Sequence, residues 1–173
     1  KIYKVDKLKT HGGSIRIYGC HIDDDKVVDK SYKELIDKEI ELGINNIDFY
    51  KNFNYTAEKI KNEFHRFLID CKEKNLFVCA YGAAAKGNTL LNYCGIKNDL
   101  ISFVCDAAEA KQNKFLPGSK IPVVHPDALK NESIIDYVII FPWNIADEVI
   151  AQLDFLRLNG TKFVKAIPKL TII

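Results

Sequence analysis

The sequence lacks methionine, has a single tryptophan, and contains no two cysteines at the C-x-x-C spacing. Because it also starts at Lys1, we expect a piece of a longer chain. The five cysteines are an odd number without zinc-ligand spacing, so no metal site is expected and a reduced, cytoplasmic setting is favoured. No apolar run reaches the roughly 18 residues of a membrane span, and no signal peptide is recognisable.

The sequence shows no basic arm and no one-sided patch of charge. The 25 basic and 23 acidic residues give a net charge of +2 and are spread evenly along the sequence. Nucleic-acid binding driven by the phosphate backbone needs clustered Lys and Arg, so neither a nucleic acid nor a membrane is expected as a partner. At 173 residues, with 47% hydrophobic and 28% charged residues, the chain is long and apolar enough to bury a globular core.

The first part of the chain, residues 1–53, is expected to form a small N-terminal strand-helix segment. The chain starts with a charged stretch. The alternation of apolar and polar residues at Ile15–Tyr18 then predicts a short strand with one solvent-exposed face. Residues 31–43 are typical of a helix that closes at Gly43. Residues 44–55 are interpreted as a linker.

Residues 54–173 alternate between apolar runs and helical segments, which favours parallel pairing with crossover connections. The run YVIIF is continuous, as expected of a strand covered on both faces. We therefore predict an α/β fold with a Rossmann-like, doubly wound, mostly parallel sheet and helices on both faces. The expected strands are 76–81, 101–105, 121–124, 137–141 and 162–167, and the expected helices are 56–74, 89–93 and 146–158.

The segment YGAAAKGNT, residues 81–89, follows the first of these strands and opens a helix. Free backbone N–H groups and the positive dipole end make a helix start a site for anions. Small side chains allow a phosphate to approach, and Lys86 adds a full positive charge. Asn88 and Thr89 are expected either to donate to a phosphate or to cap the helix.

Three interpretations of this loop compete. The phosphate loop of nucleoside triphosphatases is disfavoured, because Asn88 stands where that loop needs lysine. The dinucleotide fingerprint fits Gly82, Ala84 and Gly87, with Asp106 placed 24 positions after Gly82 for a ribose, but Ala84 replaces a required glycine. The third interpretation is a small-residue turn that only packs the helix on the strand.

Longer stretches carry a resemblance that spans almost the whole chain. The segment YGAAAKGNTLLNYCGI, residues 81–96, resembles the C-terminal domain of S-adenosylmethionine-dependent sugar C-methyltransferases. Similar stretches follow in the same order at residues 111–122 and 142–148, and residues 11–16 look like the H-G-G-S-x-R stretch of that family. Asn113, and the segment 107–110 with Glu109, depart from the family pattern.

This resemblance implies a domain that binds a nucleotide-diphosphate sugar, a precursor of deoxysugars, within a longer enzyme. The family's cysteine-rich zinc module, its G-x-G-x-G methyl-donor loop and its acid/base segment are missing from this sequence. We therefore expect this chain to bind no cofactor, S-adenosylmethionine to belong to another module of the same longer chain, and methyl transfer to be absent from the isolated chain. In the whole enzyme, a proton beside a keto group would be removed and the enolate carbon methylated.

The candidate substrate-binding residues come from three places in the sequence. No catalytic residue is assigned firmly; His11 is expected as a contact, and a role as general base is the only catalytic one considered. Lys111 and Gln112, with Pro117-Gly118, are expected to form a loop over the nucleotide. The substrate-binding candidates are Gly12, Gly13, Arg16, Tyr81, Gly82, Ala84, Lys86, Gly87, Asn88, Thr89, Asp106, Lys111, Gln112, Trp143 and Asn144.

Two rivals to this function stay open at this stage. One is an NAD(P)-type dinucleotide-binding module, and the other is a non-catalytic scaffold or interaction domain whose loop binds nothing. An exposed apolar patch on residues 1–53, where a methyl-donor module would dock, is expected under both the methyltransferase and the scaffold interpretation. Ligand binding separates them.

Overall fold

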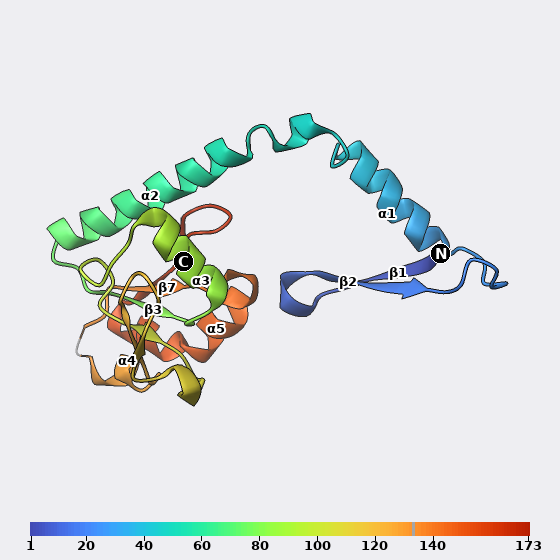
Figure 1. The fold of residues 1–173 in the computed structure, drawn as a ribbon. Helices are drawn as coiled ribbons and strands as arrows, with labels where there is room; N and C mark the ends of the chain where they lie inside the picture. The colour runs from blue at the N-terminus through green and yellow to red at the C-terminus, as the bar shows by residue number, and fades with distance from the viewer. Residues whose placement is uncertain (133) are drawn as a thin grey trace. The chain divides into compact units, whose positions relative to one another are not determined.

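The computed structural model describes residues 1–132 and 134–173, and its contacts divide the chain into two compact units (Figure 1). The first unit is Lys1–Thr56 and the second is Ala57–Ile173.

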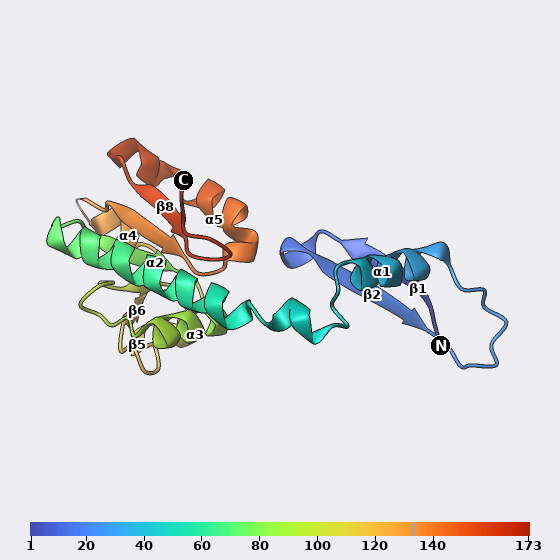
Figure 2. The ribbon, with the colours of Figure 1, turned by 90° about the horizontal axis from the view of Figure 1, so that it is seen from above.

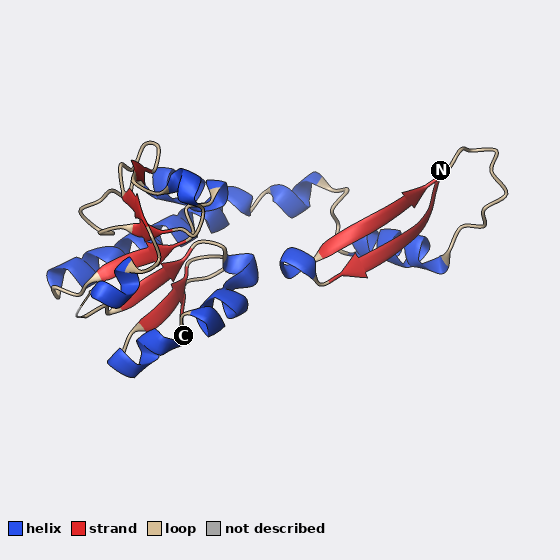
Figure 3. Cartoon of the chain, turned by 90° about the horizontal axis from the view of Figure 1, so that it is seen from below, coloured by secondary structure: helices blue, strands red, loops and turns tan. Residues whose placement is uncertain are grey.

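The first unit is a β-hairpin with one helix. Strand β1 (Ile2–Leu8) pairs antiparallel with β2 (Ser14–Gly19), and α1 (Lys30–Glu41) packs against the hairpin (Figure 3). Asp29 begins the helix by accepting a 2.8 Å hydrogen bond from the Ser31 amide. The expected strand at 15–18 and helix at 31–43 are confirmed. The prediction that the chain starts with a charged stretch outside any strand was wrong, because these residues form strand β1. Lys4 and Asp6 lie on the polar face of this strand and form a 3.2 Å ion pair.

This unit buries very little apolar surface. Val5 is its one buried hydrophobic side chain among the described residues. The segment expected to be a linker holds a 3₁₀ turn, Ile47–Tyr50, and the start of the next helix. Exposed apolar side chains of the unit include Ile15, Ile17, Ile36, Ile40, Leu42, Ile44, Ile47, Phe49, Tyr50, Phe53 and Tyr55.

The second unit is built on one seven-stranded sheet in the order β5-β6-β4-β3-β7-β8-β9 (Figure 2). The five central strands are parallel, and the two edge strands, β5 and β9, run antiparallel. This confirms the α/β class and the mostly parallel sheet. The strands are β3 (Val78–Tyr81), β4 (Val104–Cys105), β5 (Lys114–Phe115), β6 (Pro122–Val124), β7 (Tyr137–Ile140), β8 (Lys162–Lys165) and β9 (Thr171–Ile172).

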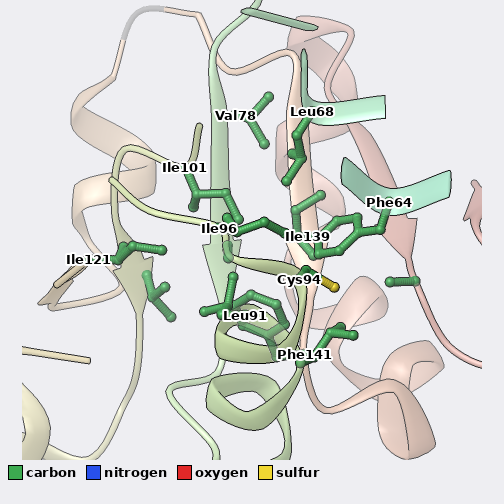
Figure 4. Close-up of a cluster of buried hydrophobic side chains, with 14 of the residues drawn as sticks. Phe64, Leu68, Val78, Leu91, Cys94, Ile96, Ile101, Ile121, Ile139 and Phe141 are labelled. Atoms are coloured by element: carbon green, nitrogen blue, oxygen red, sulfur yellow. The ribbon is translucent and has the colours of Figure 1, made fainter. Parts of the chain in front are cut away.

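Alternate residues of the central strands point to opposite sides of the sheet and are apolar on both sides. Helices therefore cover both faces. On one face, α2 (Phe53–Glu73) and α3 (Ala85–Cys94) bury Phe64, Leu68 and Leu91 against Val78 and Ile139 (Figure 4). On the other face, α4 (Ala128–Asn131) and α5 (Ala146–Gln152) cover the neighbouring strand residues, which include Cys79, Tyr81, Val138 and Ile140.

Three helix boundaries differ from the prediction by three residues or more. Helix α2 begins at Phe53 rather than at residue 56. Helix α3 begins at Ala85, four residues before the expected start, because the small residues of the loop already adopt helical geometry without apolar periodicity. Helix α5 ends at Gln152 and continues as a 3₁₀ segment, Asp154–Asn159, rather than as α-helix to residue 158. The earlier start of α3 matters for the site, because it places Lys86 in the first turn.

The buried cysteines are part of the packing. Burial raises the pKa of the Cys105 thiol to about 12 and that of Cys94 to about 11. Cys79, at 0% exposure, has a pKa raised well above its usual value by the same cause. These thiols are neutral at physiological pH and behave as small apolar side chains. All five cysteines are free.

Candidate functional site

The loop between β3 and α3 turns tightly at Gly82. This glycine has φ +93°, a conformation that L side chains rarely adopt, and its amide donates a 2.7 Å hydrogen bond to the Cys105 carbonyl. The Ala84 amide then donates to the Gly82 carbonyl at 2.8 Å. Ala84 occupies the N-cap position of α3, and its side chain makes no capping hydrogen bond. The first N–H groups of α3 therefore point out of the helix start, toward the carboxyl edge of the sheet.

Gly82 in this loop and Gly87 in the first turn of α3 let the end of β7 come close. An added Cβ at Gly82 would lie 2.5 Å from Cδ of Pro142, and one at Gly87 would lie 2.7 Å from Cβ of Phe141. Phe141 and Pro142 directly follow β7, the neighbour of β3. From β3 the chain first builds one half of the sheet through β4 and β6, and β7 then starts the other half. The two glycines thus stand at the reversal of strand order, where open α/β sheets bind ligands.

Lys86 links the two strand ends at this point. Its ammonium donates to Oδ1 of Asn144 and lies 4.8 Å from the centroid of the Trp143 ring. Trp143 and Asn144 belong to a 3₁₀ turn, Trp143–Ile145, that follows β7. A cation held over an aromatic face is stabilised without a carboxylate partner, so the positive charge of Lys86 stays available to an anion. Sequence reasoning proposed these three residues separately, and the structure brings them together.

Asp106 organises the neighbouring loop at the end of β4. Its Oδ2 accepts from the Ala83 amide at 2.8 Å and pairs with the Lys111 ammonium at 3.0 Å, and its Oδ1 accepts from the Ala108 amide at 2.8 Å. The Gln112 side chain donates to the Asp106 carbonyl at 3.0 Å. Asp106 therefore ties the α3 loop to the loop after β4.

The comparisons with known proteins agree with this architecture. The family model described as "C-methyltransferase C-terminal domain" matches residues 9–168. This chain belongs to that family. It is also 30% identical over 174 residues to the C-methyltransferase NovU of Streptomyces niveus, a match that covers 100% of this chain and 41% of NovU. The chain thus spans less than half the length of this relative.

Within this C-methyltransferase C-terminal domain, two predicted residues do not cap the helix. Asn88 and Thr89 lie inside α3, which starts at Ala85. The Thr89 hydroxyl donates to the Ala85 carbonyl at 3.1 Å, so it is used within the helix. Oδ1 of Asn88 is buried and has no hydrogen-bond partner among the described residues. The capping interpretation was wrong for both, because the helix begins four residues earlier than the apolar pattern suggested.

The loop expected over the nucleotide is split in two. Lys111 and Gln112 lie beside Asp106, before β5. Pro117 and Gly118 lie beyond the other end of β5, where their carbonyls accept from the Asn92 amide nitrogen at 3.0 Å and the Lys97 ammonium at 2.7 Å. The prediction that these four residues form one loop was wrong, because the edge strand β5, which was not predicted, lies between the two pairs.

Of the remaining predicted residues, Tyr81 is the last residue of β3, and His11, Gly12, Gly13 and Arg16 belong to the first unit. Tyr81 faces α5, where its hydroxyl donates to Gln152 at 3.4 Å and burial raises its pKa. His11 (φ 54°), Gly12 (φ 79°) and Gly13 (φ 127°) form the turn of the β1–β2 hairpin in the first unit. Arg16 lies on β2 opposite Asp6, and hydrogen bonding to Tyr18 raises its pKa.

The sequence analysis did not include Phe141 and Pro142 in the site, although they leave no room for a Cβ at Gly87 and Gly82. The proline that ends the run YVIIF could have indicated them, since it marks a turn at the same edge of the sheet. Among the described residues, no cluster of three or more His, Cys, Asp or Glu side chains could hold a metal ion. Over the same residues, no helix combines the length and apolarity needed to cross a membrane.

Proposed function

We propose that this C-methyltransferase domain binds a nucleotide-diphosphate sugar at the carboxyl edge of its sheet, between β3 and β7, within an S-adenosylmethionine-dependent enzyme of deoxysugar formation. The observation that carries the proposal is the convergence of the α3 start, Lys86 and Trp143 at the reversal of strand order. A diphosphate suits this place, because backbone N–H groups and the Lys86 ammonium meet there.

Each residue has a part in this proposal. The first turn of α3 and Lys86 hold the diphosphate, and Gly82 and Gly87 keep the two strand ends close enough for one ligand to touch both. Trp143 offers its ring to the base once Lys86 turns to the phosphates. Asp106 acts indirectly, because its carboxylate fixes the Ala83 amide and Lys111.

The contribution of such a domain to methyl transfer is positioning. Holding the sugar in one orientation can supply several kcal/mol of the barrier, about 7–11 in the best intramolecular cases. The turn with His11, Gly12 and Gly13 and the nearby Arg16 are proposed to contact the sugar from the first unit. We propose that the transferred methyl group and the proton-abstracting base belong to another module of the longer enzyme, and that the enzyme works in the reduced cytoplasm.

The residues of this chain do not fit S-adenosylmethionine. Ala84 brings a side chain to the position where cofactor loops have glycine, and both Asp106 oxygens are engaged within the loops rather than presented to a ribose. The same two observations weigh against the NAD(P)-type dinucleotide module. No step is assigned to either cofactor on this chain.

The methyl-donor module is also the proposed partner of the first unit. NovU is more than twice as long as this chain, so members of the family carry additional sequence. The first unit exposes Ile15 and Ile17 on β2 at 50% and 53%, and Ile36 and Ile40 on α1 at 37% and 55%. The unit thus exposes many apolar side chains but buries only Val5 among its described residues. Such exposure is typical of a surface that another module covers.

Tryptophan fluorescence tests the binding site, because Trp143 is the single tryptophan. We expect dTDP to change the Trp143 emission with saturation, since its base packs on the ring once Lys86 turns to the diphosphate. In Lys86→Ala the affinity should fall about 10–100-fold, as expected for the loss of one charge-assisted contact. Titration of both proteins with dTDP measures this difference.

Lys130→Ala is the matched control, because Lys130 is an ion-paired surface lysine of the same unit, on α4. It should bind dTDP like the unchanged chain. Trp143 emission that stays unchanged at high dTDP concentrations, or equal affinity in Lys86→Ala, would contradict the proposed site.

A further inference from the structure

A second concave surface lies at the other end of α3. It is a groove of about 560 Å³ between α2 and the end of α3, and its lining includes Lys61, His65, Arg66, Ile69 and Tyr93. Helix α3 has ten residues, which corresponds to about 15 Å from the start that carries Lys86 to the end that carries Tyr93. The groove is therefore separate from the proposed diphosphate site.

The groove is charged with one sign. Its ionisable lining residues include Lys61, His65 and Arg66, and no carboxylate lines it within the described part of the chain. Across residues 1–132 and 134–173, neither Lys61 nor Arg66 forms an ion pair with a carboxylate. By contrast, two other lysines of α2 are paired, Lys59 with Glu63 at 3.9 Å and Lys72 with Asp99 at 2.9 Å.

Asp99, which His65 influences electrostatically, is ion-paired with Lys72 at 2.9 Å. The charge of His65 acts on Asp99, whose pKa is lowered chiefly by its hydrogen bond with Lys72 and only to a lesser extent by His65. Since Lys72 compensates the Asp99 carboxylate, Lys61 and Arg66 keep an uncompensated positive potential over the groove. Concave surfaces lined by one sign of charge attract ligands of the opposite sign.

The groove also offers an aromatic surface. The Tyr93 side chain is 50% exposed, and the Lys61 ammonium lies 5.5 Å from its ring centroid. Ile69, at 36% exposure, and the buried Cys94 add apolar area beneath the cations. A half-exposed ring beside unpaired cations matches a ligand with a flat ring and a negative group, and the volume is in the usual range of about 300–1,000 Å³ for small-molecule sites.

We propose that this groove is a second ligand site that binds a phosphorylated small molecule with a planar ring. Lys61 and Arg66 take the phosphate, and the ring packs on Tyr93 in place of the Lys61 ammonium. The site is independent of the proposed function, because it shares no residue with the Lys86 loop. Such a site would let the level of a phosphorylated metabolite act on this domain without competing for the substrate.

Nuclear magnetic resonance of the ¹⁵N-labelled chain tests the groove with two probes, inorganic pyrophosphate and dTDP. We expect both to shift the amides of residues 61–69 and 93–95, with dTDP binding more tightly because its base contacts Tyr93. In the double variant Lys61→Gln, Arg66→Gln, the affinity measured from these shifts should fall by a factor of about ten or more. Lys59→Gln is the control, since it removes a paired charge from the same helix outside the groove.

The mapping separates this proposal from the substrate site. Shifts confined to residues 83–88 and 143–144 would overturn the groove and leave the diphosphate site standing, whereas shifts confined to the groove would do the reverse. Equal affinity for pyrophosphate and dTDP at residues 93–95 would overturn the assignment of the ring to Tyr93. Shifts that survive the double variant would overturn the role of Lys61 and Arg66.

Discussion

Replacing Phe64 by alanine is expected to lower the free energy of unfolding by about 3–5 kcal/mol. Phe64 is 0% exposed and belongs to the cluster in which α2 and α3 pack on the sheet, together with Leu91 and Ile139 (Figure 4). Removing its ring leaves a cavity between two helices and a strand that cannot close without moving all three. Urea denaturation followed by circular dichroism measures the loss.

Phe53→Ala provides the matched control. Phe53 is the same residue type on the same helix, but its side chain is 70% exposed. Its removal should change the free energy of unfolding by less than about 0.5 kcal/mol. If Phe64→Ala were no more destabilising than Phe53→Ala, the packing of α2 on the sheet would be refuted.

Replacing Gly82 by alanine should have the second large effect, about 2–5 kcal/mol of lost stability together with loss of dTDP binding. Two causes add: alanine is strained at φ +93°, and its Cβ would lie 2.5 Å from Cδ of Pro142. The loop after β3 and the turn after β7 would have to separate, which moves Lys86 away from Trp143. Thermal unfolding and the dTDP titration measure the two consequences.

Gly160→Ala separates the two causes. Gly160 has φ +82°, but an added Cβ there would meet nothing within 4 Å. This variant should show the backbone strain alone, about 1–2 kcal/mol, and should keep dTDP binding. Equal losses in the two variants would mean that the approach of Pro142 to Gly82 is unimportant.

The central sheet could be predicted because its strands are covered on both faces. Such strands are continuous apolar runs that end at Gly82, Asp106 and Pro142, and these ends are visible in the sequence. The edge strands β5 and β9 have two residues each, too few for any pattern. Strand β1 was missed because it is nearly uncovered, so charged residues alternate along it where a core strand would be apolar.

The candidate site was predictable in its parts but not in its contacts. A small-residue loop with Lys86 after a buried strand indicates an anion site from local chemistry alone. The contact of Lys86 with Trp143 and Asn144 depends on β3 and β7 being neighbours, which no local pattern specifies. The groove was missed because Lys61, His65 and Arg66 look like one solvated face of a helix until Tyr93 is placed beside them.

Calorimetric titration of this chain with dTDP, NAD and S-adenosylmethionine in parallel tests the central claim most directly. The account predicts saturable binding of dTDP with a component that disappears in Lys86→Ala, no NAD binding that depends on Lys86, and no binding of S-adenosylmethionine. Binding of NAD alone would contradict it and establish a dinucleotide module. Binding of the methyl donor alone would contradict the assignment of modules, and no binding of any of the three would leave the loop as a structural turn.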